Sequence, residues 1–413
     1  MRIHLWSYNY YPEPTGIGPV SRVLAEGLRD LGHRVEVIAA HPHYPEPKWG
    51  SRVLPYRERH HGIPVLRLPL WIGRETAMER YRQELSFMAA QLLALPVLPR
   101  PHVLVSASPC FPALLPAMLN VRMRRTPWVI WLHDILPDGA ASSGIVDEGS
   151  VVIRAARRLE RAAYRNADRI VVLSEAFAEN LMRKGVSESK IQLIYDPATR
   201  VPQRVPHQEP SNGHHAQPPR LLSMGNIGHS QGLAPLVAAF ERSDALVDTP
   251  IKFVITGNGV AAEETRSEIR SYRVQMLGVV DDERLEQELQ AATIAFVSQH
   301  HQGAEFNIPS KIMNFMAYGL PVLAAVNPGG EVARIIERAG AGWVVDSSQP
   351  DDFPRKLAEI LRSPQDIQVR GRAAYDYAQA CFTQAGFAGQ FDEALGEVVD
   401  GWRSFRGGRR RAS

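Results

Sequence analysis

Cysteine, lysine and long apolar runs are all scarce in this chain of 413 residues. Its two cysteines, Cys110 and Cys381, lie far apart and belong to no CxxC or His-Cys group. A disulfide framework is therefore excluded, and no cysteine-based metal site is indicated. No segment approaches the roughly 20 consecutive apolar residues that a membrane-spanning helix needs, and the N-terminus lacks the apolar core of a signal peptide. We expect a cytoplasmic protein, soluble or peripheral.

Net charge is also small, since 47 basic and 44 acidic residues leave only +3. This balance gives no general electrostatic drive toward nucleic acid. Six of the basic residues are lysines and the other 41 are arginines, a ratio that we attribute mainly to genomic base composition. A hydrophobic fraction of 45% and a charged fraction of 22% are ordinary for a globular enzyme, and the length predicts two domains.

Short apolar runs alternate with helix-period segments through the first half of the chain. The runs that we expect to be buried strands are Ile3–Tyr8, Arg34–Ala39, Pro64–Leu70, His102–Ser106, Trp128–Leu132 and Arg169–Leu173. A segment such as Val20–Leu31, with apolar residues three and four apart and Gly32 at its end, is typical of a helix between two of them. This alternation predicts a parallel, doubly wound sheet.

A polar, proline-rich stretch from Asp196 to Arg220 interrupts the pattern, which then restarts. The second set of predicted strands is Leu221–Met224, Lys252–Thr256, Val274–Leu277, Ile294–Val297, Pro321–Ala325 and Gly342–Val345. We therefore predict α/β domains over residues 1–200 and 220–386, about six strands in each, with a linker over 201–219. A helix over about 387–405 is expected to pack back on the first domain.

Three glycine-containing loops follow predicted strands, where ligands of such sheets bind. Their candidate binding residues are Gly16, Ile17 and Gly18; Gly225, Asn226, Gly228 and Gln231; and Gly257, Asn258 and Gly259. Glycines before a helix let backbone N–H groups approach a phosphate closely. The dinucleotide fingerprint is absent, because the third glycine of that motif is missing. The alternative is that these are turns set by packing alone.

The segment from Glu305 to Val322 predicts a helix with Pro309 in its first turn and Gly319 at its end. Lys311 in the first turn opposes the helix dipole, so a bound anion such as a diphosphate would explain it. An ordinary surface lysine is the alternative. The pair His133-Asp134 follows the strand Trp128–Leu132 and is either part of a ligand cleft or a capping pair.

Taken together, these motifs resemble family 4 glycosyltransferases of the GT-B type. The resemblance covers essentially the whole chain and rests on NYYPEPTGIG, GHRVEVIAAHPHYP, WLHDILPD, GNIGHSQGL and PSKIMNFMAYGLPVLA. The last two are the most specific. The similarity is greatest to the bacterial branch that includes colanic-acid and O-antigen sugar transferases.

The resemblance implies an α/β fold of two Rossmann-like domains that face each other across a cleft. The first would hold an acceptor and the second a nucleotide-sugar, with sugar transfer of the hexosyltransferase type, retention of anomeric configuration, and no metal or other cofactor. Gly16 and Gly18 would lie near the donor phosphate and the acceptor hydroxyl, and His133, next to Asp134, would contact the donor sugar. The residues expected at the sugar hydroxyls are Glu305, Phe306, Asn307 and Ile308. Ser310 and Lys311 would hold the diphosphate, so His133, Glu305 and Lys311 are the predicted catalytic residues.

Four positions depart from the wider family. Where the family has a second, ribose-binding glutamate this chain has Asn314, and Phe306 stands eight residues before it, next to Glu305. The Arg and Lys of the family's second glycine loop are replaced by Asn226 and Gln231. An amide still bonds hydroxyls but carries no charge. We expect Lys311 to supply the charge that the loop lacks.

Arginines recur at three- and four-residue spacing in one predicted helix. They are Arg154, Arg157, Arg158, Arg161 and Arg165. Such a row would suit contact with an anionic membrane at the inner face of the plasma membrane. The alternative is a solvated helix face on which acids such as Glu160 form ion pairs with the arginines.

We expect a UDP-sugar as the donor, with a GDP-sugar second. The acceptor is expected to be a hydroxyl of a glycan, a lipid-linked saccharide or a secondary metabolite. Two alternatives stay open at this point: a nucleotide-sugar epimerase or hydrolase of the same fold, and a catalytically inactive scaffold that binds nucleotide-sugar. The sequence gives no reason to expect nucleic acid as a partner.

Overall fold

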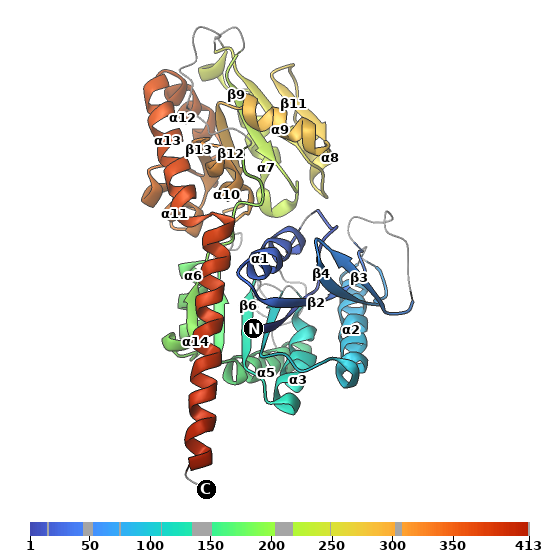
Figure 1. Ribbon diagram of the computed structural model, residues 1–413. Helices are drawn as coiled ribbons and strands as arrows, with labels where there is room; N and C mark the ends of the chain where they lie inside the picture. The colour runs from blue at the N-terminus through green and yellow to red at the C-terminus, as the bar shows by residue number, and fades with distance from the viewer. Residues whose placement is uncertain are drawn as a thin grey trace. The chain divides into compact units, whose positions relative to one another are not determined.

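The computed structural model describes residues 1–14, 16–43, 53–73, 76–108, 110–133, 151–202, 218–247, 249–301 and 308–411. These residues form two compact units (Figure 1). The first unit comprises Met1–Tyr195 together with Gln384–Ser413, and the second comprises Asp196–Thr383. Among the helices described, none is both long enough and apolar enough to cross a membrane.

The first unit is built on an eight-stranded sheet in the order β3-β4-β2-β1-β5-β6-β7-β8. Its elements are β1 (Arg2–Ser7), α1 (Gly18–Asp30), β2 (Arg34–Ala40), β3 (Tyr56–His60), β4 (Ile63–Leu68), α2 (Ala77–Ala94), the 3-10 turn η1 (Leu95–Val97), β5 (Val103–Ser108), α3 (Leu114–Arg124), β6 (Trp128–Leu132), α5 (Val151–Asn166), β7 (Arg169–Val172), α6 (Glu175–Arg183), β8 (Ile191–Leu193) and α14 (Gln384–Arg411). All neighbouring strands run parallel except β3, which is antiparallel to β4.

The second unit has a six-stranded, wholly parallel sheet in the order β11-β10-β9-β12-β13-β14. Its elements are β9 (Arg220–Met224), α7 (Leu233–Glu241), β10 (Lys252–Thr256), α8 (Ala262–Ser267), β11 (Val274–Gly278), α9 (Asp282–Ala291), β12 (Ile294–Ser298), α10 (Lys311–Ala317), β13 (Val322–Val326), α11 (Glu331–Ala339), β14 (Gly342–Asp346), α12 (Asp352–Leu361) and α13 (Pro364–Cys381). Both units are thus Rossmann-like, and the predicted fold class is confirmed.

Every predicted strand is present within a few residues, because buried parallel strands are continuous apolar runs. The expectation of about six strands in the first unit was wrong, since β3 and β8 are additional. β3 alternates half-buried and exposed residues in the sequence Tyr-Arg-Glu-Arg-His, which carries no apolar run. β8 has only three residues.

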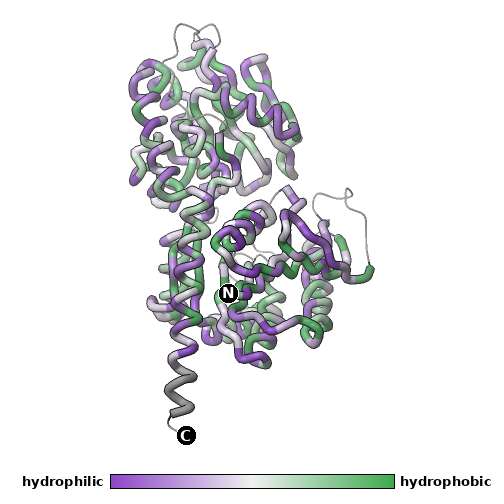
Figure 2. Tube along the Cα trace, viewed as in Figure 1, coloured by the Kyte–Doolittle hydropathy of each residue, from purple (hydrophilic) through white to green (hydrophobic). Residues whose placement is uncertain are grey.

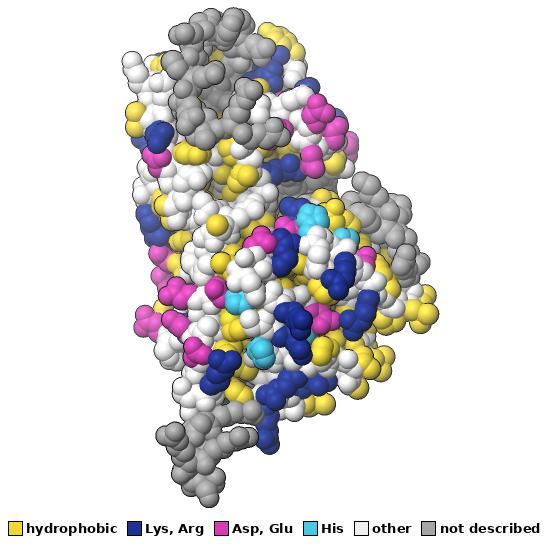
Figure 3. Space-filling view, viewed as in Figure 1, with side chains coloured by type: hydrophobic (Ala, Val, Ile, Leu, Met, Phe, Trp, Pro, Cys, Tyr) yellow, Lys and Arg dark blue, Asp and Glu magenta, His cyan; other side chains and the backbone are white. Residues whose placement is uncertain are grey.

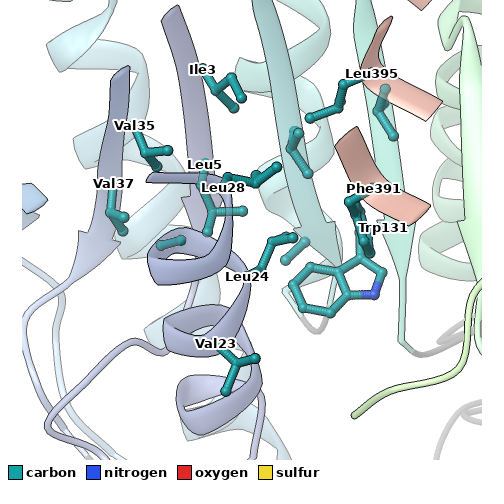
Figure 4. Close-up of a cluster of buried hydrophobic side chains, with 14 of the residues drawn as sticks. Ile3, Leu5, Val23, Leu24, Leu28, Val35, Val37, Trp131, Phe391 and Leu395 are labelled. Atoms are coloured by element: carbon teal, nitrogen blue, oxygen red, sulfur yellow. The ribbon is translucent and has the colours of Figure 1, made fainter. Parts of the chain in front are cut away.

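The core of the first unit joins both ends of the chain (Figure 4). Leu5 of β1 and Leu24 of α1 are fully buried, and so are Phe391 and Leu395 of α14. Trp131 of β6 packs edge-on against Phe391, with ring centroids 5.3 Å apart. The apolar spacing of α14 therefore places the last helix in the core of the first unit.

The first unit ends at Tyr195 rather than at residue 200. The next residues belong to the second unit because Ala198 N donates to Phe382 O at 2.8 Å, which ties the entry of the second unit to its exit. Residues 203–217 of the predicted linker lie outside the described part of the chain.

A buried arginine connects the edge hairpin to the loop after β1. Arg67 of β4 is fully buried and pairs with Glu58 of β3 at 2.6 Å. The same guanidinium donates to Ala40 O and to Tyr11 O. A buried cation needs such partners, and here they fix the backbone that leads into the first glycine loop.

Candidate functional site

In the second unit, the loop after β9 and the turn after β10 are joined backbone to backbone. Gly225 N donates to Thr256 O, and Ile227 N donates to Asn258 O, each at 3.0 Å. A Cβ atom on Gly257, whose φ is +118°, would lie 1.8 Å from Gly225 O. Since no side chain fits there, glycine is required for the two loops to approach this closely.

Lys311, the first residue of α10, lies beside this loop pair. Its Cε atom is within 3.9 Å of a Cβ built on Gly225. Together with Gly225, Asn226, Gln231 and Ser298, it lines a narrow pocket between the two loops and α10. The structure therefore brings the predicted diphosphate lysine and the predicted glycine loop to one place, although their roles stay predictions.

The ammonium of Lys311 makes no hydrogen bond and no ion pair within the described residues. Its half-buried side chain is partly desolvated, and this burial lowers the pKa of Lys311 to about 8. Ser310 is exposed and serves as the N-cap residue of α10 without a side-chain cap bond. Pro309 was expected in the first turn but precedes that N-cap, and its carbonyl accepts from Ile312 N at 3.0 Å.

The two amides that replace family cations have different surroundings. Gln231 Oε1 accepts from Gly228 N at 2.8 Å, so this side chain braces its own loop. Asn226 is exposed at the mouth of the pocket. Asn258 Oδ1 accepts from Gly259 N at 2.9 Å, an ordinary turn-forming contact. Of these side chains, Asn226 has the surroundings of a ligand contact.

Asn314 lies one turn along α10 from Lys311 and is buried. Its Oδ1 accepts from Arg200 N at 3.0 Å and from Thr199 Oγ1 at 3.4 Å. The Arg200 side chain in turn pairs with Asp282 of α9. The amide at the family's ribose position thus holds the segment by which the chain enters the second unit.

In the first unit, the candidate loop folds back on itself. Gly16 has φ +63° and is exposed, whereas Ile17 places its side chain in the core, so only its backbone is free to face a ligand. A Cβ on Gly18 would meet Glu13 O at 2.8 Å. Gly18 is therefore needed for the loop to close as well as for the approach of a ligand.

Glu13 and His43 form a buried polar centre under this loop, and sequence reasoning did not single them out. Glu13 accepts from Asn9 Nδ2 at 2.9 Å, from His43 N at 3.1 Å and from Tyr10 N at 3.2 Å. Burial nevertheless raises the pKa of Glu13. The available signal was a single carboxylate between two prolines in the loop that follows the first strand.

His133 stands at the end of β6 against the ring of Trp131, with centroids 4.5 Å apart. Burial lowers the pKa of His133 to about 3. The imidazole is therefore neutral at neutral pH and can exchange hydrogen bonds with a sugar hydroxyl but supply no charge. Ile308 is half-buried before α10. Asp134, Glu305, Phe306 and Asn307 lie outside the described residues.

The arginine row occupies α5. Arg154, Arg158, Arg161 and Arg165 are exposed and Arg157 is half-buried. Glu160 is buried and bonds Lys184 Nζ at 2.8 Å and the Tyr164 hydroxyl at 3.1 Å. Glu160 therefore bonds a lysine and a tyrosine rather than the arginines of the row.

No group of three or more His, Cys, Asp or Glu side chains suited to a metal ion occurs among the described residues.

Comparison with known proteins identifies both units. Residues 15–196 match the glycosyl transferase 4-like domain, and residues 205–377 match the glycosyl transferases group 1 domain. Over 413 aligned residues the chain is 26% identical to WcaI of Escherichia coli K12. WcaI is described as a colanic acid biosynthesis glycosyl transferase. That alignment covers 95% of this chain and 98% of WcaI.

Two solved structures have the same fold, each with a TM-score of 0.70. Sucrose-phosphate synthase from Thermosynechococcus elongatus is 18% identical, over 97% of this chain and 100% of its own. Anabaena Alr3699/HepE, solved in complex with UDP and glucose, is 17% identical, over 96% and 100%. These likenesses confirm the resemblance seen in the sequence motifs. The chain belongs to the GT-B glycosyltransferases, with a glycosyl transferase 4-like domain in its first unit and a group 1 glycosyltransferase domain in its second.

Proposed function

We propose that this enzyme transfers a sugar from a nucleotide-sugar to a hydroxyl with retention of anomeric configuration. The observation that carries the proposal is the ammonium of Lys311, which lies next to the backbone of the Gly225 loop with no anion of its own among the described residues. A diphosphate would fill that role. Charge develops on the diphosphate as it leaves, and a preplaced cation stabilises it where water is excluded.

The remaining steps are positioning. Lys311, Ser310 and the N–H groups of the glycine loop hold the diphosphate, and neutral His133 bonds a hydroxyl of the donor sugar. The acceptor oxygen attacks on the face from which the diphosphate departs, so that the configuration is kept. Orientation of this kind supplies much of the rate. No metal or other cofactor takes part in this scheme.

A UDP-sugar is the proposed donor, ahead of a GDP-sugar. The likeness to HepE, whose structure contains UDP and glucose, supports this choice. The likeness to WcaI supports a glycan or lipid-linked saccharide as the acceptor, ahead of a secondary metabolite. Action on a lipid-linked acceptor would place the enzyme at the inner face of the plasma membrane, where the arginines of α5 can meet anionic lipid.

The amide of Asn314 has a positioning role in this scheme. It connects α10, which begins with Lys311, to the backbone of Arg200. We assign to it the fixing of the entry segment relative to the donor site, in place of the ribose contact that a glutamate makes in the wider family.

Lys311→Ala should lower kcat by about 10²–10³-fold with saturating donor, the range seen when one preorganised charge-stabilising group is lost. Lys356→Ala is the matched control, because that half-buried lysine of α12 forms an ion pair with Glu359 on the surface of the second unit. Initial rates with both variants check the prediction. Full turnover by Lys311→Ala would contradict the assignment.

The pH profile should show the lysine directly. The ammonium is charged below its pKa of about 8, so kcat/KM is expected to fall as pH rises through that value. Lys311→Arg keeps its charge at any working pH, so its lower kcat/KM should stay flat over the same range. A variant that follows the wild-type decline would point to another titrating group.

A thermal-shift panel tests the donor. At equal concentrations UDP should raise the melting temperature more than GDP, because the ligand with the lower Kd stabilises the folded enzyme more. A ligand held at 100 times its Kd adds about 2.7 kcal/mol to the free energy of unfolding. Product analysis with UDP-sugar alone completes the test. Rapid turnover without acceptor would favour an epimerase or hydrolase, and a thermal shift with nucleotide but no turnover in the presence of acceptor would favour the inactive scaffold.

Asn314→Leu should remove the acceptor for Arg200 N and reduce the free energy of unfolding by about 1–3 kcal/mol, the usual cost of an orphaned buried donor. Hydrogen exchange at the Arg200 amide should accelerate in the same variant. Asn314→Asp retains an acceptor oxygen and should leave that exchange slow. Equal protection in all three proteins would show that the bond does not hold the segment.

A further inference from the structure

Helix α2 presents an apolar row to solvent. Its exposed residues Met78, Arg82, Leu85, Ala89 and Leu93 follow one another at intervals of three and four, which puts them on one helix face, whereas Arg80 is exposed on another. Met78, Leu85 and Leu93 are 61%, 48% and 83% exposed. Single exposed apolar residues are ordinary, but three large ones on one helix face, with Arg82 between them, indicate an interaction surface.

The row continues beyond the helix. Val97 in η1 is exposed, and so is Met123 near the end of α3. The Arg124 guanidinium donates to Leu95 O at 2.7 Å and so holds the end of α3 against η1. We call Met78, Leu85, Leu93, Val97 and Met123 the α2 stripe. Figures 2 and 3 show hydrophobic colouring on α2 and hydrophobic side chains along that edge of the first unit.

An aromatic side chain lies alongside. Trp71 is 47% exposed, and its backbone N donates to Ser86 Oγ of α2 at 2.8 Å. Tryptophan is enriched where an apolar phase meets water, because its ring is amphipathic.

Positive charge lies on the helix face of the stripe and at one end of the stripe. Arg80 and Arg82 are exposed on α2, and Arg100, Arg122 and Arg125 are exposed at the end where η1 and α3 meet. Glu79 of α2 is engaged in a capping box with Thr76. In a symmetric dimer that buried this surface, the arginines of one copy would face those of the other and repel them. An anionic lipid surface matches both the apolar row and its basic rim.

We propose that the α2 stripe inserts into the interface of an anionic membrane while the neighbouring arginines bind lipid headgroups. This inference rests on the membrane association proposed for α5 and adds an anchoring element. α3 packs against both α2 and α5, so the helices belong to one layer of the first unit. Among the described residues of α5 no large apolar side chain is exposed, so that part of α5 can attract a membrane but offers no large apolar side chain for insertion.

Vesicle flotation of the full chain tests the proposal. The wild type should float with vesicles of phosphatidylcholine and phosphatidylglycerol but not with phosphatidylcholine alone. Leu93→Ser with Val97→Ser should weaken binding at least about tenfold, because both side chains lose their transfer into the apolar phase. Tyr272→Ser with Val369→Ser is the matched control. Both residues are exposed apolar positions of the second unit, and binding should not change.

Charge is tested separately. Arg82→Gln and Arg122→Gln should each weaken binding about fivefold at low salt. Arg158→Gln with Arg161→Gln probes α5 in the same assay. The UDP-induced thermal shift should be unchanged in every variant, which shows that each is folded and keeps its donor site.

Three results would overturn the proposal. In the first result, the α5 variant fails to float while Leu93→Ser/Val97→Ser binds fully. The protein would then bind membranes through α5, and the α2 stripe would have no part in that binding. If the wild type did not float, neither the membrane association proposed for α5 nor insertion of the α2 stripe would hold. A wild-type dimer in light scattering that Leu93→Ser/Val97→Ser converts to a monomer would assign the stripe to a second copy.

Discussion

The site depends on one constraint, the contact of two backbones at Gly225 and Gly257. Because a side chain on Gly257 would collide with Gly225 O, the two loops can meet only with glycine there, and their N–H groups and the start of α10 come together at one narrow pocket. Lys311 enters that pocket without an anionic partner among the described residues, and its lowered pKa is the cost of that placement. A cation held in this way is less stable alone than beside a diphosphate, so the geometry favours the ligand that the enzyme must later release.

The architecture of each unit supports this arrangement. The chain enters the second unit at Asp196 and leaves it at Thr383, and the bond from Ala198 to Phe382 ties the two passages together. Asn314 then binds the entry passage to the helix that carries Lys311. After leaving, α14 completes the core of the first unit through residues such as Phe391. The last segment of the chain is therefore structural for the first unit, although it follows the second.

Much of this could be predicted from sequence, and the exceptions have physical causes. Buried parallel strands and glycine loops leave local signals, so the sheets and the meeting of Lys311 with Gly225 were foreseeable. The contact of Asn314 with Arg200 spans 114 positions and has no local signature. β3 was missed because its polar residues depend on Arg67 of β4 for a partner. The period of α2 was visible, but which of its faces stays uncovered depends on tertiary packing.

Charge is distributed unequally behind the net value of +3. In the second unit the half-buried ammonium of Lys311 is partly desolvated. A small change in its surroundings therefore changes both its pKa and its affinity for an anion. On the first unit, arginines such as Arg122 act in water, where each contributes little and only their number and their neighbouring apolar row give useful affinity. The donor site is therefore sensitive to a single substitution, whereas the surface of the first unit depends on the sum of many weak contacts.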